Sequence, residues 1–422
     1  MTVIPDQFLR GLFDAALTAA RPETRVPPFL PAPPRGRTVV VGAGKAAASM
    51  AKAVEDHYAG TIAAGLVVTR YHHGLPLQKI EVVEAGHPKP DAAGQQAAQR
   101  ILDLAGTLGP DDLLLCLISG GGSALLTLPA PGLTMEDVKN VNDALLVSGA
   151  TIHEFNCVRK HLSAISGGRL ARAANGARVV ALIISDVPGD DLSVIASGPT
   201  VGDPTRFADA REILERYGIT PPAAVAAHLT AAREETVKPD DPCLERVANI
   251  LITRPQDMLE AAASYARQQG IPPLILGNAI EGESRDVALV MAGITQQVLE
   301  FNQPLPAPCV LISGGETTVT VRGKGKGGRN SEFLLYLAMA LRGHPRVHAI
   351  SCGTDGSDGT EDNAGAIIHP GTLAAAAAKG AQPKTYAARN DSYSFFALCD
   401  GLVHTGPTRT NVNDFRAIYI TD

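Results

Sequence analysis

The chain of 422 residues has no tryptophan, and only 4% of its residues are aromatic. So few aromatic rings argue against a stacking platform for single-stranded nucleic acid. The formal net charge of −6 also argues against general nucleic-acid binding. We therefore expect a small-molecule ligand and no nucleic-acid partner.

Disulfide and membrane features are also missing. The six cysteines are scattered and form no C-x-x-C pair, which in a chain of this length indicates reduced thiols and not a disulfide framework or a zinc site. No apolar run reaches the ~20 residues of a membrane span, and Asp6, Arg10 and Asp14 interrupt the segment where a signal peptide would lie. We expect a cytoplasmic protein with no membrane partner.

Several catalytic signatures are absent from the sequence. It contains no G-x-x-x-x-G-K-[ST], no protein-kinase set, no H-E-x-x-H and no G-x-S-x-G. His72, His73, His87 and His161 lack metal-ligand spacing, so we expect structural or loop roles for them.

What the chain does contain is an alternation of apolar strand-like runs with helical segments, which predicts an α/β protein. The continuous apolar runs at 113–118 and 179–184 indicate strands buried on both faces. The polar, proline-bearing segment 236–243 indicates a crossing between domains. We predict a Rossmann-like domain over 1–238 with a mostly parallel three-layer sheet, and a smaller α/β domain over 239–422 with a mixed sheet.

Local patterns give further expectations. The proline-rich segment 22–34 is predicted to be extended, and the alternation at 316–321 predicts a half-buried strand. The run at 247–252 is predicted to be a strand of the second domain, and the apolar periodicity of 6–20 predicts a helix.

The segment 38–53 predicts an anion site at the start of the first domain. A β-branched strand reaches a turn at Gly42 and Gly44, and a helix of small residues follows. Such a helix start presents unpaired N–H groups and a partial positive charge, and Lys45 adds a full one. The alternative is an ordinary strand-to-helix turn with a solvated lysine.

Two apolar strands run into Ser-Gly-Gly. Glycines let the backbone approach an anion closely, and the N–H groups and serine hydroxyl donate to it. The alternative is a pair of tight turns. The residues concerned are Ser119, Gly120, Gly121, Gly122 and Ser123 in the first segment and Ser313, Gly314 and Gly315 in the second.

The segment 324–330 combines glycines with cations directly before a helix. Its cationic side chains suit phosphate oxygens, and Arg329 is the last of them. The alternative is a disordered hairpin tip.

Two acidic loops follow strands, one with Asp186 and Asp190 and one with Asp355 and Asp358. Carboxylates there suit Mg²⁺, which takes one or two and completes its shell with water and phosphate oxygens. One of them could instead orient or deprotonate a substrate hydroxyl. The sequence does not choose between these roles, and turn-forming Asp and Gly remain the alternative.

The turn at Gly42 also fits the loose dinucleotide pattern G-x-G-x-x-A, so an NAD(P)-dependent dehydrogenase is the second hypothesis. Arg70 stands where an acid would bind the ribose hydroxyl, although an arginine could accommodate a 2′-phosphate. A non-catalytic nucleotide-binding module is a third.

From about residue 6 to residue 420 the chain resembles the glycerate kinase family that forms 2-phosphoglycerate, whose C-terminal part is called the MOFRL domain. The motifs that carry the resemblance are GAGKAAASMAKAVE (42–55), GHPKPD (86–91), SGGGSALL (119–126), VRKHLS (158–163), ISDVPGDDLSVIASGPTVGDPT (184–205), SGGETTVTVRGKGKGGRNSEF (313–333), GTDGSDGTEDNAGA (353–366) and TGPTRTNVNDF (405–415). Ser166, Thr360 and Arg409 depart from the family pattern.

The resemblance implies ATP- and Mg²⁺-dependent phosphorylation of D-glycerate at its 2-hydroxyl, in a cleft between the two domains of a monomer or homodimer. Some relatives carry a hydroxypyruvate reductase label, which makes an NAD(P)-dependent hydroxypyruvate reductase the alternative. The predicted catalytic residues are Lys45, Arg329, Asp186 and Asp190, and the two aspartates are also the predicted metal ligands. The predicted cofactor-binding residues are Gly42, Gly44, Ser119, Gly120, Gly121, Gly122, Ser123, Ser313, Gly314, Gly315, Glu316, Lys326, Gly327, Gly328, Asn330 and Asp355.

Overall fold

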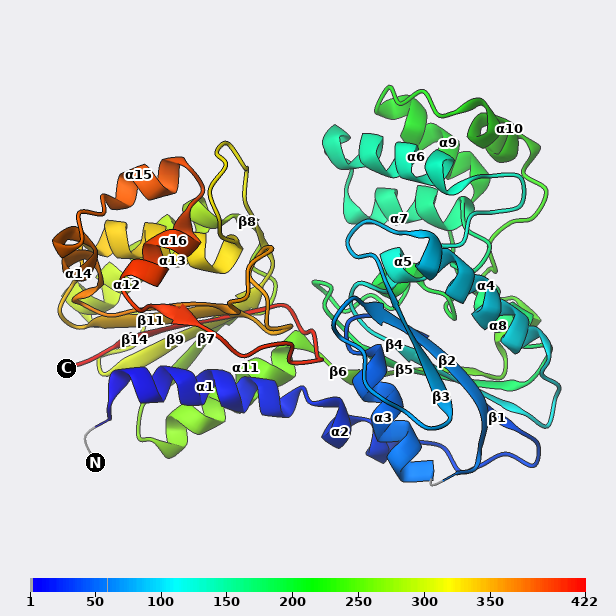
Figure 1. Cartoon of the computed structure of the whole chain (residues 1–422), viewed down its shortest axis with the longest axis horizontal. Helices are drawn as coiled ribbons and strands as arrows, with labels where there is room; N and C mark the ends of the chain where they lie inside the picture. The colour runs from blue at the N-terminus through cyan, green and yellow to red at the C-terminus, as the bar shows by residue number, and fades with distance from the viewer. Residues whose placement is uncertain (1–2, 59) are drawn as a thin grey trace. The chain divides into compact units, whose positions relative to one another are not determined.

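The computed structural model describes residues 3–58 and 60–422. The chain forms two compact units (Figure 1). Unit 1 combines Met1–Arg21 with Thr253–Asp422, and unit 2 is Pro22–Ile252.

Unit 2 is built on a six-stranded sheet with the order β3-β2-β1-β4-β5-β6. Its strands are β1 (Thr38–Ala43), β2 (Ile62–Arg70), β3 (Ile80–Ala85), β4 (Leu113–Ile118), β5 (Arg178–Ile184) and β6 (Val247–Thr253). All pairings from β3 to β5 are parallel. The strand order reverses between β1 and β4, which is where ligands bind in open sheets of this kind.

Helices of unit 2 contribute to two of the apolar clusters that the described residues form. The helices of unit 2 are α2 (Pro22–Arg25), α3 (Ala47–Tyr58), α4 (Ala92–Gly106), α5 (Gly122–Leu125), α6 (Met135–Ser148), α7 (Ile152–His161), α8 (Arg169–Ala173), α9 (Phe207–Arg216) and α10 (Ala223–Ala231), with short 3₁₀ turns at Pro27–Phe29, Ile195–Ser197 and Pro242–Leu244. In the larger cluster α4 and α8 pack against the sheet. In the smaller one Phe155 of α7 and Phe207 of α9 join α6 and α10 in a core of their own.

Unit 1 is built on a six-stranded mixed sheet with the order β13-β12-β11-β14-β9-β7. Its strands are β7 (Pro273–Gly277), β9 (Cys309–Gly315), β11 (Val347–Gly353), β12 (Gly365–Ile368), β13 (Leu402–Val403) and β14 (Asp414–Ile420), and β8 (Gly282–Glu283) pairs separately with β10 (Thr317–Thr318). Only β7 and β9 run parallel, and the other pairings are antiparallel. The predicted α/β class, with a parallel first sheet and a mixed second one, is confirmed.

The helices of unit 1 come from both ends of the chain. They are α1 (Pro5–Ala19), α11 (Pro255–Gln268), α12 (Ser284–Phe301), α13 (Arg329–Leu341), α14 (Thr372–Ala378), α15 (Pro383–Ala388) and α16 (Ser392–Leu398). The periodic apolar face of α1 packs beside α11 (Figure 1), with the ring of Phe8 4.8 Å from that of Tyr419 and 6.1 Å from that of Tyr265. Phe13 lies 5.7 Å from Phe415 in the same way.

The two units do not match the predicted domains, 1–238 and 239–422. Residues up to Arg21 lie in the C-terminal unit, and unit 2 extends to Ile252. α1 belongs with the C-terminal unit because its apolar face is covered by α11 and β14. β6 completes the first sheet beside β5, although its sequence follows the proline-bearing segment. Both differences come from pairings between segments far apart in the chain.

Three local expectations are corrected. Segment 22–34 begins with short helical turns because Pro22 and Pro27 stand at helix starts. Only Thr317–Thr318 of segment 316–321 is paired, and Ser313–Gly315 belongs to β9 and not to a loop. The predictions also missed β14, although it is buried along its whole length.

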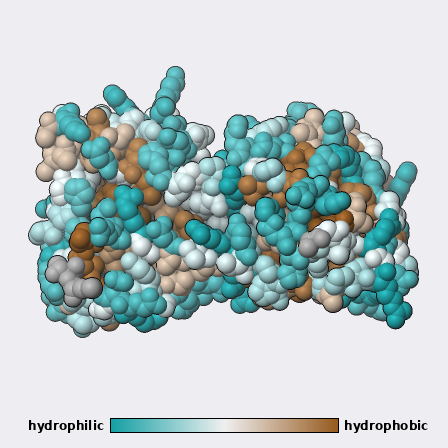
Figure 2. Space-filling model, turned by 60° about the horizontal axis from the view of Figure 1, so that its bottom comes forward, coloured by the Kyte–Doolittle hydropathy of each residue, from teal (hydrophilic) through white to brown (hydrophobic). Residues whose placement is uncertain are grey.

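No helix within the part of the chain that the structure describes is long and apolar enough to cross a membrane. On the face shown in Figure 2, hydrophilic residues surround separate hydrophobic patches. All six cysteines are free thiols, as expected.

Candidate active site

The turn after β1 is locked to the loop after β4. The Lys45 N–H donates to the Gly120 carbonyl at 2.8 Å, and the Ala46 N–H donates to the Ser119 hydroxyl at 3.0 Å. Gly44 has φ +138°, and a Cβ there would overlap Ser119. The N–H groups that were predicted to bind an anion are therefore hydrogen-bonded to the first Ser-Gly-Gly segment. At this turn only the side chain of Lys45 could contact an anion.

A pocket of about 260 Å³ opens beside this turn, at the carboxyl ends of β4 and β5. Its polar lining consists of His87, Ser123, Asn156, Arg159 and Asp186. The Ser123 hydroxyl lies 2.9 Å from that of Ser197, which donates to Asn156 at 2.8 Å. The pocket thus lies at the carboxyl ends of parallel strands, the edge of such a sheet where ligands bind.

Backbone donors also face this pocket. Among the described residues, the N–H groups of Gly121 and Ser123, which line it, donate to no protein acceptor. These two N–H groups are the backbone donors of the first glycine segment that an anion in the pocket could use. His87 also lies here, because a Cβ on Gly121 would come within 2.9 Å of its Nε2 atom; only a loop or structural role was expected for it.

The structure separates the two aspartates that the sequence left equivalent. Asp186 lines the pocket and Asp190 is not among its lining residues. Asp190 has φ +57°, and its Oδ1 atom is buried without a hydrogen-bond partner among the described residues. An orphaned carboxylate oxygen suits a cation, whereas Asp186 is placed to reach a substrate.

Arg159 lines the pocket but was not among the predicted site residues. It lies on α7 at the spacing i, i+4, i+7 with Ile152 and Asn156, and all three line the pocket. Its guanidinium lies 4.3 Å from the ring centroid of Phe155. Burial lowers the pKa of Arg159 to about 10, so it remains charged near neutral pH. The conspicuous segment VRKHLS was the available signal, but it does not say which basic residue faces a ligand.

The two residues after Arg159 have structural partners. Lys160 pairs with Asp203 at 3.5 Å, and both side chains are buried. His161 lies 3.2 Å from Glu235 and 2.8 Å from the Cys157 carbonyl, and burial lowers its pKa. The expected structural role of His161 fits this placement.

In unit 1, Arg329 stands at the start of α13 between two carboxylates. Its Nε atom donates to Asp414 at 2.7 Å, and its Nη1 atom lies 2.9 Å from Glu316. Burial alone would lower the pKa of Arg329, but Asp414, Glu316 and Asp355 together hold it above its usual value. The charge of Arg329 is therefore largely balanced within the protein, and the half-exposed Glu316 is the partner that an incoming anion could displace.

Asp414 is the centre of this cluster, and the predictions did not include it. It is fully buried and also accepts hydrogen bonds from Arg416 at 3.1 Å and from the Asn330 amide at 2.9 Å. Asn330 is buried as well, and its amide oxygen accepts from Ser351 at 2.6 Å. Both ends of the Asn330 amide are thus engaged within the protein.

The second Ser-Gly-Gly segment has a packing explanation. Gly315 has φ +118°, and a Cβ there would overlap the backbone of Ile280. The Gly314 carbonyl accepts from the Ile280 N–H at 3.2 Å. Close backbone approach accounts for these glycines without a ligand.

The segment 324–330 is ordered by internal hydrogen bonds. The N–H groups of Gly325, Lys326 and Gly328 donate to Arg389, Asp391 and Ser331. The Lys326 ammonium lies 3.3 Å from Glu361. Gly327 and Gly328 pack tightly against Ser392 and Asp358. The Asn330 N–H is bonded to Asp358 as well, so the segment has fewer backbone donors for a phosphate than its sequence suggested.

The second acidic loop holds unit 1 together. Asp358 accepts from the N–H groups of Asn330 and Ser331 at 2.9 Å and so caps α13, and burial raises its pKa. Asp355 is buried and accepts from the Ser357 N–H at 3.0 Å. Within residues 3–58 and 60–422, no group of three or more His, Cys, Asp or Glu could hold a metal ion.

Comparisons with known proteins agree across nearly the whole chain. Residues 8–230 match a family described as "Domain of unknown function (DUF4147)", and residues 309–414 match the MOFRL family. D-glycerate 2-kinase of Thermotoga maritima is 42% identical over 400 residues, covering 94% of each chain. The chain belongs to the glycerate 2-kinase family.

A further relative and a solved structure are similar to this glycerate 2-kinase family member over nearly its whole length. A protein from Agrobacterium vitis named "Putative hydroxypyruvate reductase" is 51% identical over 418 residues, covering 98% of this chain and 94% of the relative. The crystal structure of glycerate kinase from Thermotoga maritima superposes with a TM-score of 0.88 at 40% identity, covering 99% of this chain and 100% of that one.

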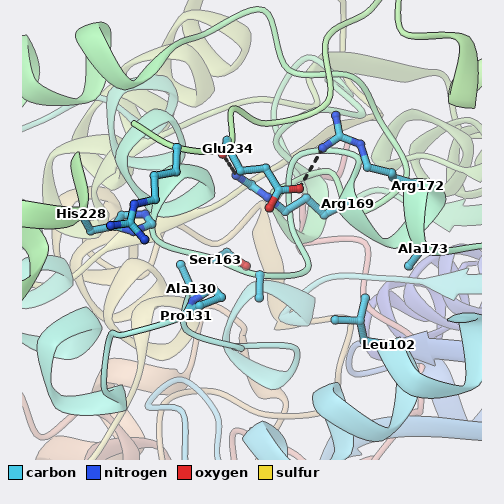
Figure 3. A pocket seen from close by; sticks show the side chains of 11 residues that line it. Leu102, Ala130, Pro131, Ser163, Arg169, Arg172, Ala173, His228 and Glu234 are labelled. Carbon is cyan, nitrogen blue, oxygen red and sulfur yellow. Dashed lines mark hydrogen bonds and ion pairs between the residues drawn. The ribbon is translucent and has the colours of Figure 1, made fainter. Parts of the chain in front are cut away.

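A second pocket of this glycerate 2-kinase family member lies elsewhere in unit 2. It measures about 470 Å³ and is lined by Arg169, Arg172 and Glu234, among others (Figure 3). Arg172 pairs with Glu234 at 3.2 Å, and Arg169 donates to the Lys160 carbonyl at 2.9 Å. None of the predicted site residues lines it, and these two arginines already have protein partners.

Proposed function

We propose that the chain phosphorylates D-glycerate at its 2-hydroxyl with ATP and Mg²⁺, giving 2-phospho-D-glycerate and ADP. Family membership supports a glycerate kinase. The observation that carries the assignment of the acceptor site is the small pocket at the ends of β4 and β5. It combines the carboxylate of Asp186 with the hydroxyl of Ser123, which suits a small hydroxylated acid, while the Asn156 amide is held by Ser197 and the Ile152 carbonyl.

Phosphoryl transfer depends mainly on positioning and charge neutralisation. We assign Asp186 to orient the acceptor hydroxyl and accept its proton. Lys45 and Arg329 offset negative charge on the transferred group, and Arg329 does so after Glu316 releases it. The N–H groups of Gly121 and Ser123 are the best-supported backbone donors to an anion, and Gly120, Gly122 and Ser119 shape that loop.

The orphaned oxygen of Asp190 fits the hard oxygen ligands that Mg²⁺ prefers. Asp190, with Asp186 in the same loop, would hold the ion, which supplies charge neutralisation on the phosphate oxygens when bound. The remaining predicted nucleotide contacts, Ser313 to Glu316, Lys326 to Gly328, Asn330 and Asp355, stay proposals. Among them Glu316 and Lys326 have exposed side chains able to change partners, whereas Asn330 is fully engaged.

The reductase alternative has one specific observation in its favour, the printed name of the Agrobacterium vitis relative. Against it, the N–H groups of Lys45 and Ala46, which follow the glycine turn where a dinucleotide pyrophosphate binds, are already bonded to Gly120 and Ser119. Gly42 and Gly44 then serve close packing of β1 on β4.

The test is ³¹P NMR of the product from D-glycerate, ATP and Mg²⁺, which reports both turnover and the phosphorylated position. A parallel incubation with hydroxypyruvate and NADH or NADPH follows nucleotide absorbance. A 2-phosphoglycerate signal with ADP supports the proposal. A 3-phosphoglycerate signal rejects the regiochemistry, and nucleotide oxidation without any phosphorylated product rejects the kinase.

A further inference from the structure

The segment 159–161 places three basic side chains in succession, and the structure treats them differently. Lys160 and His161 are buried against Asp203 and Glu235. In the part of the chain that the structure describes, Arg159 has neither a hydrogen-bond partner nor an ion-pair partner. A cation left without an acid inside the protein is available to a ligand.

The position of Arg159 is fixed before any ligand arrives. Its guanidinium carbon lies over the ring of Phe155, which is itself buried in the small helical core. Stacking on an aromatic ring occupies the face of the guanidinium and leaves its N–H edges free. The guanidinium of Arg159 is thus held at the pocket wall, and its side chain loses little rotamer entropy when a ligand binds.

The pocket favours a carboxylate as the group that Arg159 holds. A planar guanidinium matches a carboxylate with two parallel hydrogen bonds. Asp186 is the acidic residue among the pocket's lining residues, and it repels a doubly charged phosphate more strongly than a singly charged carboxylate. The volume of about 260 Å³ also suits a small acid.

We propose that Arg159 is the carboxylate-binding residue of the acceptor site, and that it selects small 2-hydroxycarboxylates over neutral polyols and amides. This inference rests on the proposed function. With the carboxylate held at α7, the substrate hydroxyl lies toward Asp186, which follows the carboxyl end of β5. One side chain then binds the carboxylate and another accepts the proton. The carboxylate then needs no contact with Lys45, which we assign to the phosphoryl group.

The experiment compares Arg159→Met and Arg159→Lys with the wild type, using D-glycerate and its neutral isostere D-glyceramide as substrates. Arg216→Gln is the matched control, because Arg216 also contacts α7, through Glu154 at 2.8 Å, but is 54% exposed on the outer surface. KM and kcat for each substrate, KM for ATP and the thermal midpoint are measured for each protein.

We expect Arg159→Met to raise the KM for D-glycerate roughly 100-fold, the cost of removing one partner of a desolvated charge pair. Arg159→Lys should raise it roughly 10-fold, because a lysine keeps the charge but not the fork. KM for ATP and the thermal midpoint should stay near wild type, and the preference for glycerate over glyceramide should fall by the same factor as KM rises.

The outcomes are separable. A wild type that turns over D-glycerate, with Arg159 variants that keep both its KM and the glyceramide discrimination, rejects this inference and leaves the kinase intact. A wild type inactive on D-glycerate rejects the proposed function itself. Equal losses on glycerate and glyceramide, or a fallen thermal midpoint in Arg159→Lys, would assign Arg159 a structural role and overturn the inference.

Discussion

Replacing Lys160 by methionine should destabilise unit 2 strongly while leaving the pocket residues in place. The change keeps the length and apolar stem of the side chain but removes the charge opposite Asp203. That carboxylate is fully buried, and its Oδ2 atom has no hydrogen-bond partner among the described residues. Thr205 donates only to Oδ1, at 2.8 Å through its hydroxyl and 3.2 Å through its N–H.

The magnitude follows from the geometry. The charges are 3.5 Å apart, and at an effective dielectric constant of about 20 their attraction is about 5 kcal/mol. Removing one partner of a buried pair costs roughly 3–5 kcal/mol in practice, because the other charge stays buried. In a unit of this size each kcal/mol shifts the midpoint by about 2–4 °C, so a fall of roughly 6–20 °C is expected.

Scanning calorimetry and urea unfolding of wild type, Lys160→Met and Lys160→Met/Asp203→Asn measure this effect. The double variant should recover most of the loss, because the asparagine is neutral. A single-variant loss below about 1 kcal/mol, or a double variant no more stable than the single one, would refute the reasoning.

The pH dependence supplies a second check with a defined sign. Burial alone would raise the pKa of Asp203, but Lys160, Thr205 and His161 bring it below its ordinary value. In the wild type this contribution is therefore present above the unfolded pKa and is lost as pH falls through the lower folded pKa. In Lys160→Met the burial effect dominates, so the pKa of Asp203 in the folded variant lies above its unfolded value. Protonation of Asp203 in acid therefore stabilises the variant, and the difference in unfolding free energy between wild type and variant should narrow toward low pH.

Three further outcomes are expected. Lys45→Ala should lower kcat/KM by roughly 10³-fold or more with an unchanged thermal midpoint, and near-normal turnover would remove Lys45 from the mechanism. Asp186→Asn should lower kcat by roughly 10²–10⁴-fold, whereas Asp190→Asn should chiefly raise the Mg²⁺ concentration needed for half-maximal rate; the reverse pattern would exchange their roles. Gly315→Ala should lower the free energy of unfolding in urea by about 3 kcal/mol because of backbone overlap and positive φ. Gly293→Ala, in open space on α12, should be neutral or stabilising. Equal urea midpoints for the two variants would contradict the packing explanation.

The sequence predicted most of the elements because their apolar periodicity is local. β4 was predicted residue for residue, and a helix was expected directly after the segment 324–330, where α13 begins at Arg329. β14 was missed because Asp414 and Arg416 break the apolar pattern of a strand that is nevertheless buried. Their burial is tolerable only because Arg329 and Asn330, far away in the chain, complete the charges and hydrogen bonds.

The candidate site was predictable at the level of loops but not of atoms. The turn at Lys45, the segment at Ser119 and the loop of Asp186 were predicted as candidates because glycine and charge follow apolar strands. Which backbone donors remain unused depends on contacts between these loops, such as Lys45 with Gly120. Arg159 was not singled out, because only the fold reveals which basic residue of its segment lacks an acidic partner.

The division of unit 1 between the two ends of the chain has a consequence for its synthesis. When α1 leaves the ribosome, the surfaces that cover Phe8 and Phe13, including Tyr265, Phe415 and Tyr419, do not yet exist. At about 5–20 residues per second, roughly 20 s or more separate that moment from the emergence of β14. During this interval the apolar face of α1 is exposed to solvent. Nascent chains should therefore bind holdase chaperones through α1 until β14 has been released.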